Sequence, residues 1–353
     1  MGSKVSLNWF SHMGFAFICF LSVIFILVAC SSNSPEGASQ ENKQVNVVTT
    51  IYPLEYFVSR IGGEHVKVTN LAGVGADAHT LELIPSQLQD IQSADLLFAN
   101  GLSMEPWFER AIESLGSEAA SKVTYLSGFE FTKLKFKEGH DDHDEHKEGH
   151  DDHDEHKEGH DDHDEHKEGH DDHHHGEYDP HIWLDPLYAI KQAKEVTDVL
   201  SAKDPDNLSY YLGNFQKLEG DLQLIHQDFA NGFSRCEHEE FVISHAAFGY
   251  IAARYNLTQI EIAGLSADAT PSALRLAEIT ERVEKLGLKA VLVEALQQEN
   301  SVSQTLANET NLQVLPIHVI GTVTASELSE HGDYIGLMRN NLKSLQTAME
   351  CSA

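Results

Sequence analysis

Basic residues are scarce in this sequence. Of its 353 residues, 24 are Lys or Arg and 56 are Asp or Glu, so the formal net charge is −32 at pH 7. A surface of this sign repels phosphate backbones, which excludes nucleic-acid binding and favours a cationic ligand. A wholly disordered chain is excluded too, because 41% of the residues are hydrophobic. The length predicts about two domains.

A membrane-spanning helix is not expected, because the N-terminal apolar run, residues 14–29, is shorter than the ~20 residues that a span requires. The run follows Lys4 and ends in Leu27-Val28-Ala29-Cys30, which is the pattern of a secretory signal. The small residues before Cys30 resemble a lipoprotein signal over residues 1–29, with Cys30 as the lipidated first residue of the mature chain. An ordinary cleaved signal with an incidental cysteine is the alternative. Residues 30–44 are polar and predict a flexible tether.

Cysteine is equally scarce, with four residues in the chain. Cys19 leaves with the signal and Cys30 would carry lipid, so the rest of the mature chain holds Cys236 and Cys351. Two thiols tend to pair in an oxidising compartment, which favours a disulfide. Two free thiols are the alternative. The expected location is the periplasmic or cell-surface face of a membrane, as an exported lipoprotein.

Short apolar runs alternate with helical patterns along both halves of the mature chain. This alternation is typical of α/β architecture with parallel sheets. We expect one α/β lobe over residues 45–203 and a second over residues 233–353. Strands are expected at residues 45–50, 66–71, 94–99, 241–244, 259–262, 290–293 and 313–317.

One long helix is predicted between the two halves, over residues 204–232. Asp204 can cap its N-terminus and Pro205 suits its first turn. Apolar side chains then recur at steps of three and four residues, which predicts one continuous buried stripe. The helix is either an ordinary core helix or a rigid strut packed against both lobes. The stripe consists of Tyr211, Phe215, Leu218, Leu222, Ile225 and Phe229.

A ten-residue unit rich in histidine and acid, residues 137–146, recurs unchanged at 147–156 and 157–166, and an altered copy follows. Residues 137–177 hold 13 of the 22 histidines, and their 4 lysines and 19 acids give a charge of −15. Glycine apart, the segment has no apolar residue, so we expect it to be disordered. Imidazole with carboxylate suits zinc, nickel or copper, which predicts a weak zinc antenna. A solubilising spacer is the alternative.

Three single histidines occupy positions where α/β proteins place ligands. His79 lies in a glycine-containing turn after an expected strand. His181 lies between two Asp-Pro pairs, and His245 directly follows another expected strand, residues 241–244. Taken singly, each is more often a structural histidine than a ligand.

Taken together, these motifs resemble the metal-binding proteins of ABC importers for zinc and manganese, the ZnuA-like group. The resemblance covers residues 45–353. A histidine-rich acidic segment just before the Asp-Pro-His motif is also typical of the zinc-binding members. The motifs are Thr-Ile-Tyr-Pro at 50–53, Asp-Ala-His at 77–79, Ser-Ala-Asp-Leu at 93–96, Asp-Pro-His-Ile-Trp-Leu-Asp-Pro at 179–186, Ser-His-Ala-Ala-Phe-Gly-Tyr at 244–250, Gly-Leu-Ser at 264–266 and Thr-Pro-Ser at 270–272.

The resemblance implies two Rossmann-like lobes joined by a long rigid helix, with the metal in the cleft between them. His79 and His181 would come from the first lobe and His245 from the second. The fourth ligand would be Asp333 or water. Manganese-binding members usually carry a carboxylate at the position of His245, so this histidine favours zinc, which prefers nitrogen ligands more than manganese does.

The function that follows is capture of Zn²⁺ outside the cytoplasmic membrane and its delivery to an ABC permease. We expect a monomer with no catalytic activity. The alternatives are a protein for manganese or another divalent metal, and a zinc-buffering protein or adhesin whose working part is the repeat. A zinc hydrolase is disfavoured, because the sequence has no His-Glu-x-x-His pair and no serine-elbow motif.

Overall fold

The computed structural model describes residues 44–76, 78–135, 177–265, 271–295 and 302–352. The predicted signal, the lipidation site Cys30 and the tether up to residue 43 lie outside the described residues. So do residues 137–176 of the histidine-rich repeat. The described elements belong to one compact unit that begins at Gln44.

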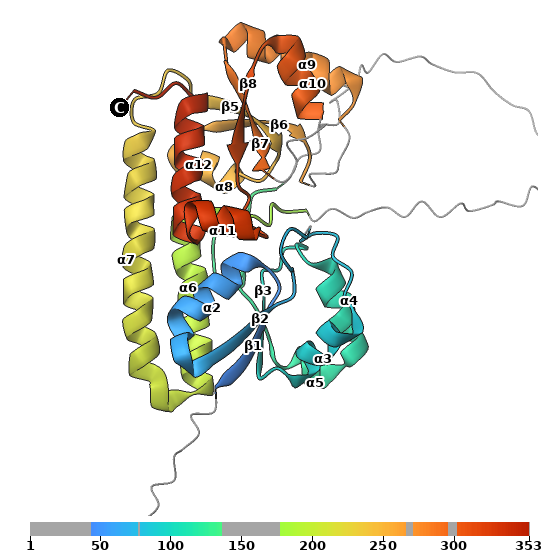
Figure 1. Ribbon diagram of the computed structural model, residues 1–353, viewed down its shortest axis with the longest axis vertical. Coiled ribbons are helices and arrows are strands. Elements are labelled where there is room, and N and C mark those ends of the chain that lie inside the picture. Colours follow the sequence, from blue (N-terminus) through green and yellow to red (C-terminus); the bar gives the residue numbers. More distant parts are fainter. Residues whose placement is uncertain (1–43, 77, 136–176, 266–270, 296–301, 353) are drawn as a thin grey trace, which may run out of the picture. The chain divides into compact units, whose positions relative to one another are not determined.

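The N-terminal lobe is built on a parallel sheet in the order β2-β1-β3-β4 (Figure 1). The inner strand β3 is entirely apolar, as expected where helices cover both faces of a parallel sheet, whereas the edge strand β2 carries Lys67, Thr69 and Asn70. The three-residue strand β4 was not predicted. The elements are β1 (Val45–Thr49), α2 (Tyr52–Gly62), β2 (Val66–Asn70), α3 (Pro85–Ser93), β3 (Leu96–Ala99), α4 (Pro106–Leu115), α5 (Ser117–Ala120) and β4 (Val123–Tyr125).

The C-terminal lobe repeats this plan with a parallel sheet in the order β6-β5-β7-β8. The two sheets confirm the predicted α/β class. The elements are β5 (Glu240–His245), α8 (Gly249–Tyr255), β6 (Thr258–Ala263), α9 (Ala273–Leu286), β7 (Ala290–Glu294), α10 (Val302–Thr310), β8 (Gln313–Ile317), α11 (Ala325–His331) and α12 (Tyr334–Ala348).

Two long helices, α6 (Pro186–Lys203) and α7 (Leu208–Gly232), connect the sheets. The predicted helix starts four residues later than expected, because Pro205–Asn207 form a short 3-10 helix after Asp204. All six side chains of the predicted stripe are buried. Helix α7 contacts α2 of the first lobe and α12, which itself packs on β7 and β8 of the second. It is therefore a strut that both lobes share.

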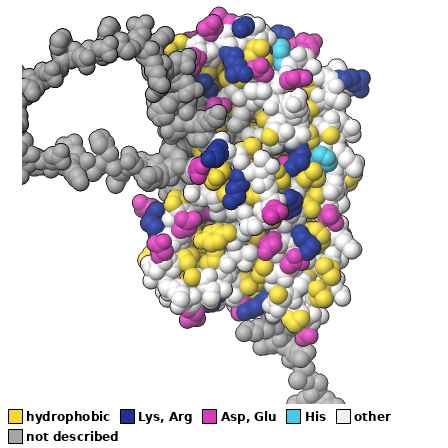
Figure 2. Space-filling model, turned by 180° about the vertical axis from the view of Figure 1, so that it is seen from behind, with side chains coloured by type: hydrophobic (Ala, Val, Ile, Leu, Met, Phe, Trp, Pro, Cys, Tyr) yellow, Lys and Arg dark blue, Asp and Glu magenta, His cyan; other side chains and the backbone are white. Residues whose placement is uncertain are grey.

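The hydrophobic core runs without a break from one lobe to the other. A single cluster of buried side chains includes Phe57 of α2, Leu218 of α7, Phe248 before α8 and Tyr334 of α12. Acidic and basic side chains are interspersed over the face shown in Figure 2. No helix among the described residues combines the length and the apolar character that crossing a bilayer requires.

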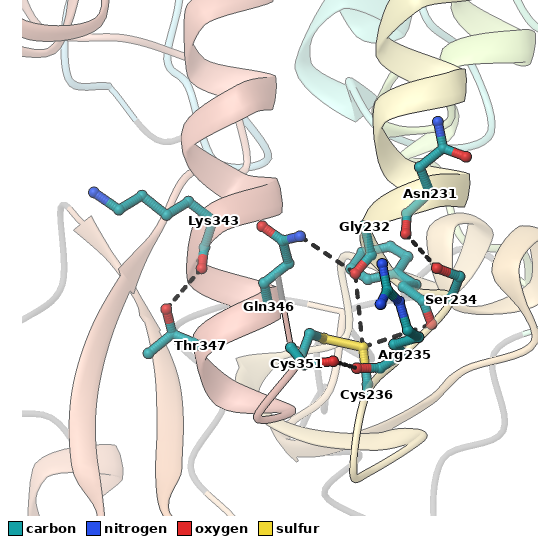
Figure 3. Close-up of a disulfide and its surroundings, with 11 residues drawn as sticks. Asn231, Gly232, Ser234, Arg235, Cys236, Lys343, Gln346, Thr347 and Cys351 are labelled. Carbon is teal, nitrogen blue, oxygen red and sulfur yellow. Dashed lines mark hydrogen bonds between the residues drawn. A yellow bond between two sulfur atoms is a disulfide. The ribbon is translucent and has the colours of Figure 1, made fainter.

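The predicted disulfide between Cys236 and Cys351 is present (Figure 3). It joins the segment that follows α7 to the segment that follows α12. Backbone hydrogen bonds flank it, from Ser352 N to Arg235 O at 2.9 Å and from His238 N to Met349 O at 3.2 Å. The chain terminus after α12 is thereby fixed to the end of the strut.

We predict that replacing both cysteines with serine lowers the free energy of unfolding by up to ~4–5 kcal/mol, because the disulfide closes a long loop in the unfolded chain. The two cysteines are 115 residues apart in sequence. Urea denaturation of the wild type and the double variant measures the difference. Thiol titration of the unfolded, unreduced mature protein should detect no free thiol at these positions, and two titratable thiols there would contradict the pairing.

Candidate metal centre

His181 is completely buried and its imidazole is held by a neighbouring carboxylate. Its Nδ1 lies 2.8 Å from Oδ1 of Asp179, and the same oxygen accepts the His181 backbone N–H at 2.9 Å. The other ring nitrogen, Nε2, is buried and has no hydrogen-bond partner among the residues that the structure describes. A carboxylate on one imidazole nitrogen and an available lone pair on the other is the usual arrangement of a metal-ligating histidine.

The buried surroundings set the protonation of this pair. Burial lowers the pKa of His181 to about 3, so its imidazole does not take up a second proton at neutral pH. Burial also raises the pKa of Asp179 to about 8, against the opposing effects of the His181 backbone N–H and of His79. A cation bound to His181 Nε2 would counteract the effect of burial on Asp179 and lower the pKa of its carboxyl. The ionised carboxylate would then accept a hydrogen bond from Nδ1.

The loop that carries His181 is anchored on the carboxyl end of the N-terminal sheet. Asn100, which follows β3, is fully buried and donates from Nδ2 to Pro180 O at 2.9 Å. Gln192 of α6 donates to Asn100 Oδ1 at 3.1 Å. Glu105 in turn accepts the Asn100 backbone N–H at 2.8 Å and the Thr50 hydroxyl at 2.6 Å. These bonds satisfy buried polar groups and fix the position of the loop.

Residues of the C-terminal lobe hold the same loop from the other side. Tyr250 donates from its hydroxyl to Asp179 O at 2.8 Å. Trp183 donates from Nε1 to Val319 O at 2.8 Å, and the Tyr334 hydroxyl donates to Trp183 O. Both lobes therefore position His181.

The three predicted histidines come together around His181. The ring of His79 lies 5.5 Å from the ring of His181, and the ring of His245 lies 5.7 Å from it on the C-terminal lobe, measured between centroids. His79 is half-buried, and the residue before it, Ala78, accepts a hydrogen bond from Trp107 Nε1 at 2.8 Å. His245 is buried and ends β5.

Asp333, the predicted alternative to water as fourth ligand, and Glu294 are two carboxylates whose surroundings differ. Asp333 is the N-cap of α12, where its Oδ1 accepts Gly336 N–H at 3.1 Å and its Oδ2 accepts the Tyr56 hydroxyl at 3.0 Å. Glu294, at the end of β7, places Oε2 3.6 Å from His245 Nδ1. Sequence reasoning did not single out Glu294, because its nearness to His245 depends on the pairing of β7 with β5.

The comparisons with known proteins agree with each other. A family model described as "Zinc-uptake complex component A periplasmic", or ZnuA, matches residues 47–348. The chain is 32% identical over 326 residues to the zinc-binding lipoprotein AdcA of Streptococcus pneumoniae, covering 91% of this chain and 58% of AdcA. It is 31% identical over 331 residues to the high-affinity zinc uptake system protein ZnuA of Bacillus subtilis, covering 93% and 96%. The chain thus spans less than two thirds of AdcA.

Solved structures show the same fold. The Zn(II)-bound ZnuA-like domain of S. pneumoniae AdcA superposes with a TM-score of 0.66 at 28% identity, covering 87% of this chain and 99% of that domain. The metal-dependent lipoprotein YcdH of B. subtilis gives the same TM-score, identity and coverage. Both lobes of this chain are therefore included in the likeness.

We predict that zinc binding releases about one proton from Asp179 below pH 8 and progressively less above it. The carboxyl is protonated below its pKa of about 8 in the metal-free protein. The bound cation would lower this pKa and keep the carboxylate ionised between pH 7 and 9. Calorimetry between pH 7 and 9 in buffers of different ionisation enthalpy measures the release, in a range where ordinary imidazoles, with a pKa of ~6.5, are already neutral.

Asp179→Asn is the control, because the amide cannot titrate. It should remove this pH-dependent release and weaken zinc binding by ~10–100-fold, as expected for loss of a residue that orients a ligand. An unchanged release in Asp179→Asn would contradict the assignment of the proton.

Proposed function

This chain belongs to the ZnuA family of zinc-uptake components, and from that premise we propose that it captures Zn²⁺ outside the cytoplasmic membrane and delivers it to an ABC permease. The observation that carries the proposal is the position of His181. Its buried Nε2 has no hydrogen-bond partner among the described residues, and two further imidazoles lie against it. The proposed role is binding and release, without catalysis.

The proposed site consists of His79, His181 and His245. Neutral imidazole is a preferred ligand of Zn²⁺ and a poor one for Mg²⁺ or Ca²⁺, which take oxygen ligands. Zinc–nitrogen bonds of ~2.0–2.1 Å can bridge imidazoles at the ring separations seen here after small side-chain adjustments. Three histidines without a carboxylate also favour zinc over manganese, the alternative cargo.

Water is the fourth ligand that we favour over Asp333. Both carboxylate oxygens of Asp333 already accept hydrogen bonds, one of which caps α12. Glu294 lies beside His245 instead, with its Oε2 3.6 Å from Nδ1, where its negative charge would favour a cation held by the ring. If water is the fourth ligand, a ligand from the permease can replace it and bind the ion while the histidines release it.

The histidine-rich segment is proposed to supply zinc to this site. Its two ends are paired, with Lys135 and Tyr178 in an antiparallel bridge and Asp179 N–H donating to Leu134 O at 2.9 Å. The chain therefore leaves the lobe after Lys135 and re-enters it beside that residue at Tyr178, shortly before His181. Its charge of −15 should raise the local concentration of cations, and its tether keeps released ions near the tighter site.

The remaining parts of the proposal concern location and partners. We propose that Cys30 carries lipid, that residues 30–44 tether the protein to a membrane, and that the protein acts as a monomer at the extracytoplasmic surface. The names of the zinc-binding lipoprotein AdcA and the zinc uptake protein ZnuA support this location and the importer role. Zinc buffering by the repeat alone is the competing function.

Replacing His79, His181 or His245 with alanine should each remove the tight site. The expected loss of affinity exceeds the ~10–100-fold typical of a supporting residue, because the ion loses a direct ligand. Competition against a chelator of known affinity measures the tight site without contribution from weak sites. His226→Ala is a matched control, because His226 lies on α7 against Tyr255. Wild-type affinity in all three variants would place the site elsewhere.

Deleting residues 137–176 should remove the weak sites and slow zinc capture at low metal concentration. The affinity of the tight site should stay within a few-fold, because the bridge between Lys135 and Tyr178 is retained. Calorimetry and stopped-flow capture of the two proteins test this. Weak binding should fade toward pH 5.5, since imidazole must be neutral to bind zinc and its free pKa is ~6.5. Identical stoichiometry and capture rate in both proteins would make the segment a spacer.

A further inference from the structure

A second buried histidine, His318, is held in the same way as His181. It directly follows β8, and 4% of its surface is exposed. Its Nδ1 lies 2.8 Å from Oε1 of Glu327 on α11. The side-chain amide of Asn341 brackets its backbone, accepting His318 N–H at 2.8 Å and donating to His318 O at 2.7 Å. The ring is therefore fixed in one orientation.

The second ring nitrogen of His318, Nε2, has similar surroundings to Nε2 of His181. His318 Nε2 is buried and has no hydrogen-bond partner among the described residues. An ionised Glu327 makes Nδ1 the hydrogen-bond donor, so the lone pair is on Nε2. Buried polar atoms are rarely left unsatisfied without a functional reason.

A second imidazole lies against the first. His331 is one helical turn after Glu327 on α11, so the two side chains share a face of the helix. The rings of His318 and His331 are 5.0 Å apart, closer than the 5.5 and 5.7 Å between the rings of the three-histidine cluster. Glu330 adds an exposed carboxylate, with Oε2 4.0 Å from His331 Nε2.

We propose that His318 and His331 form a second site for a borderline divalent cation such as Zn²⁺, separate from the His79–His181–His245 cluster. Two imidazoles, with water completing the coordination, suit zinc and disfavour magnesium. Two protein nitrogens instead of three make this the weaker site. The proposal goes beyond the proposed function and does not depend on it, because none of its ligands belongs to the first cluster.

The proposed second site lies at the segment through which the C-terminal lobe bonds to the N-terminal lobe. His318 and α11 are the two ends of a segment whose residues bond to the N-terminal lobe. A cation held by both ends would stabilise the segment and with it the contact between lobes. The bonds are Trp183 Nε1 to Val319 O at 2.8 Å, Tyr52 N to Gly321 O at 3.0 Å and Thr322 Oγ1 to Ala76 O at 2.8 Å.

The test is histidine-selective labelling of the full-length protein with diethyl pyrocarbonate, followed by peptide mass spectrometry. Each peptide is read separately, so the repeat histidines do not obscure the result. Zinc at about ten times the Kd should slow the labelling of His331 roughly ten-fold, by simple occupancy. Magnesium should give no protection. His181→Gln should keep the protection at His331 even where it abolishes tight binding at the first cluster, so the two proposals can fail separately.

His318→Gln should abolish the protection at His331, and Glu327→Gln should weaken it by releasing the ring. His226→Gln should leave it unchanged. Circular dichroism establishes that each variant is folded, and zinc-edge anomalous diffraction of the wild type provides a second measurement if His318→Gln does not fold. A peak bonded to both imidazoles is expected. Absence of zinc protection, protection that persists in folded His318→Gln, or an anomalous map without this peak would overturn the proposal.

Discussion

The hydrogen bond between Asp179 and His181 is the interaction on which the rest of the site depends. It is completely buried, so it fixes the imidazole without competition from water. Asn100 holds the loop from the N-terminal lobe, and Tyr250 holds it from the C-terminal lobe. A change in either lobe that shifted the loop would move His181 relative to its two neighbours. The candidate metal centre is therefore a property of the assembled lobes.

The hydrophobic cluster shared by the two lobes limits how the protein could respond to the proposed cation. Helix α7 contacts α2 and α12, and one hydrophobic cluster extends through both lobes. Hinge closure of the kind seen where two domains share few contacts would have to break this packing. We expect cation binding to act instead through local changes, at the turn that carries His79 and in the segment that follows His318. The segment after His318 bonds to the N-terminal lobe through Val319 O and the Thr322 hydroxyl. The turn that carries His79 includes Ala76, whose carbonyl accepts the bond from Thr322.

Sequence predicted the parts of this structure that have local causes. The stripe on α7 follows from helical periodicity, and the apolar strands follow from burial on both faces. The short strand β4 lacks a periodic signal, and the start of α7 moved because Pro205–Asn207 adopt a tighter turn. The three histidines of the candidate site were found through motifs shared with a family. Their supporting residues, Asn100 and Glu294, were missed.

Those supporting residues were missed for a physical reason. Asn100 and Pro180 are eighty residues apart in sequence, and Glu294 reaches His245 only because β7 is placed next to β5. Nothing in the local sequence encodes strand order. His318 directly follows β8, but its interest lies in Glu327 and His331, which the turn into α11 brings over it.

Charge balance explains why a cluster of neutral imidazoles can both hold and release a divalent ion. In the proposed site the three histidines would contribute nitrogen ligands and no charge, so the compensating charge would have to come from carboxylates one layer further out. Asp179 and Glu294 occupy that layer, beside His181 and His245. Burial raises the pKa of Asp179, so in the absence of the ion its carboxyl favours the protonated form. Proton uptake by Asp179 would then accompany loss of the ion and would avoid leaving an uncompensated buried charge. The carboxylate that strengthens binding in the loaded state therefore also lowers the cost of release.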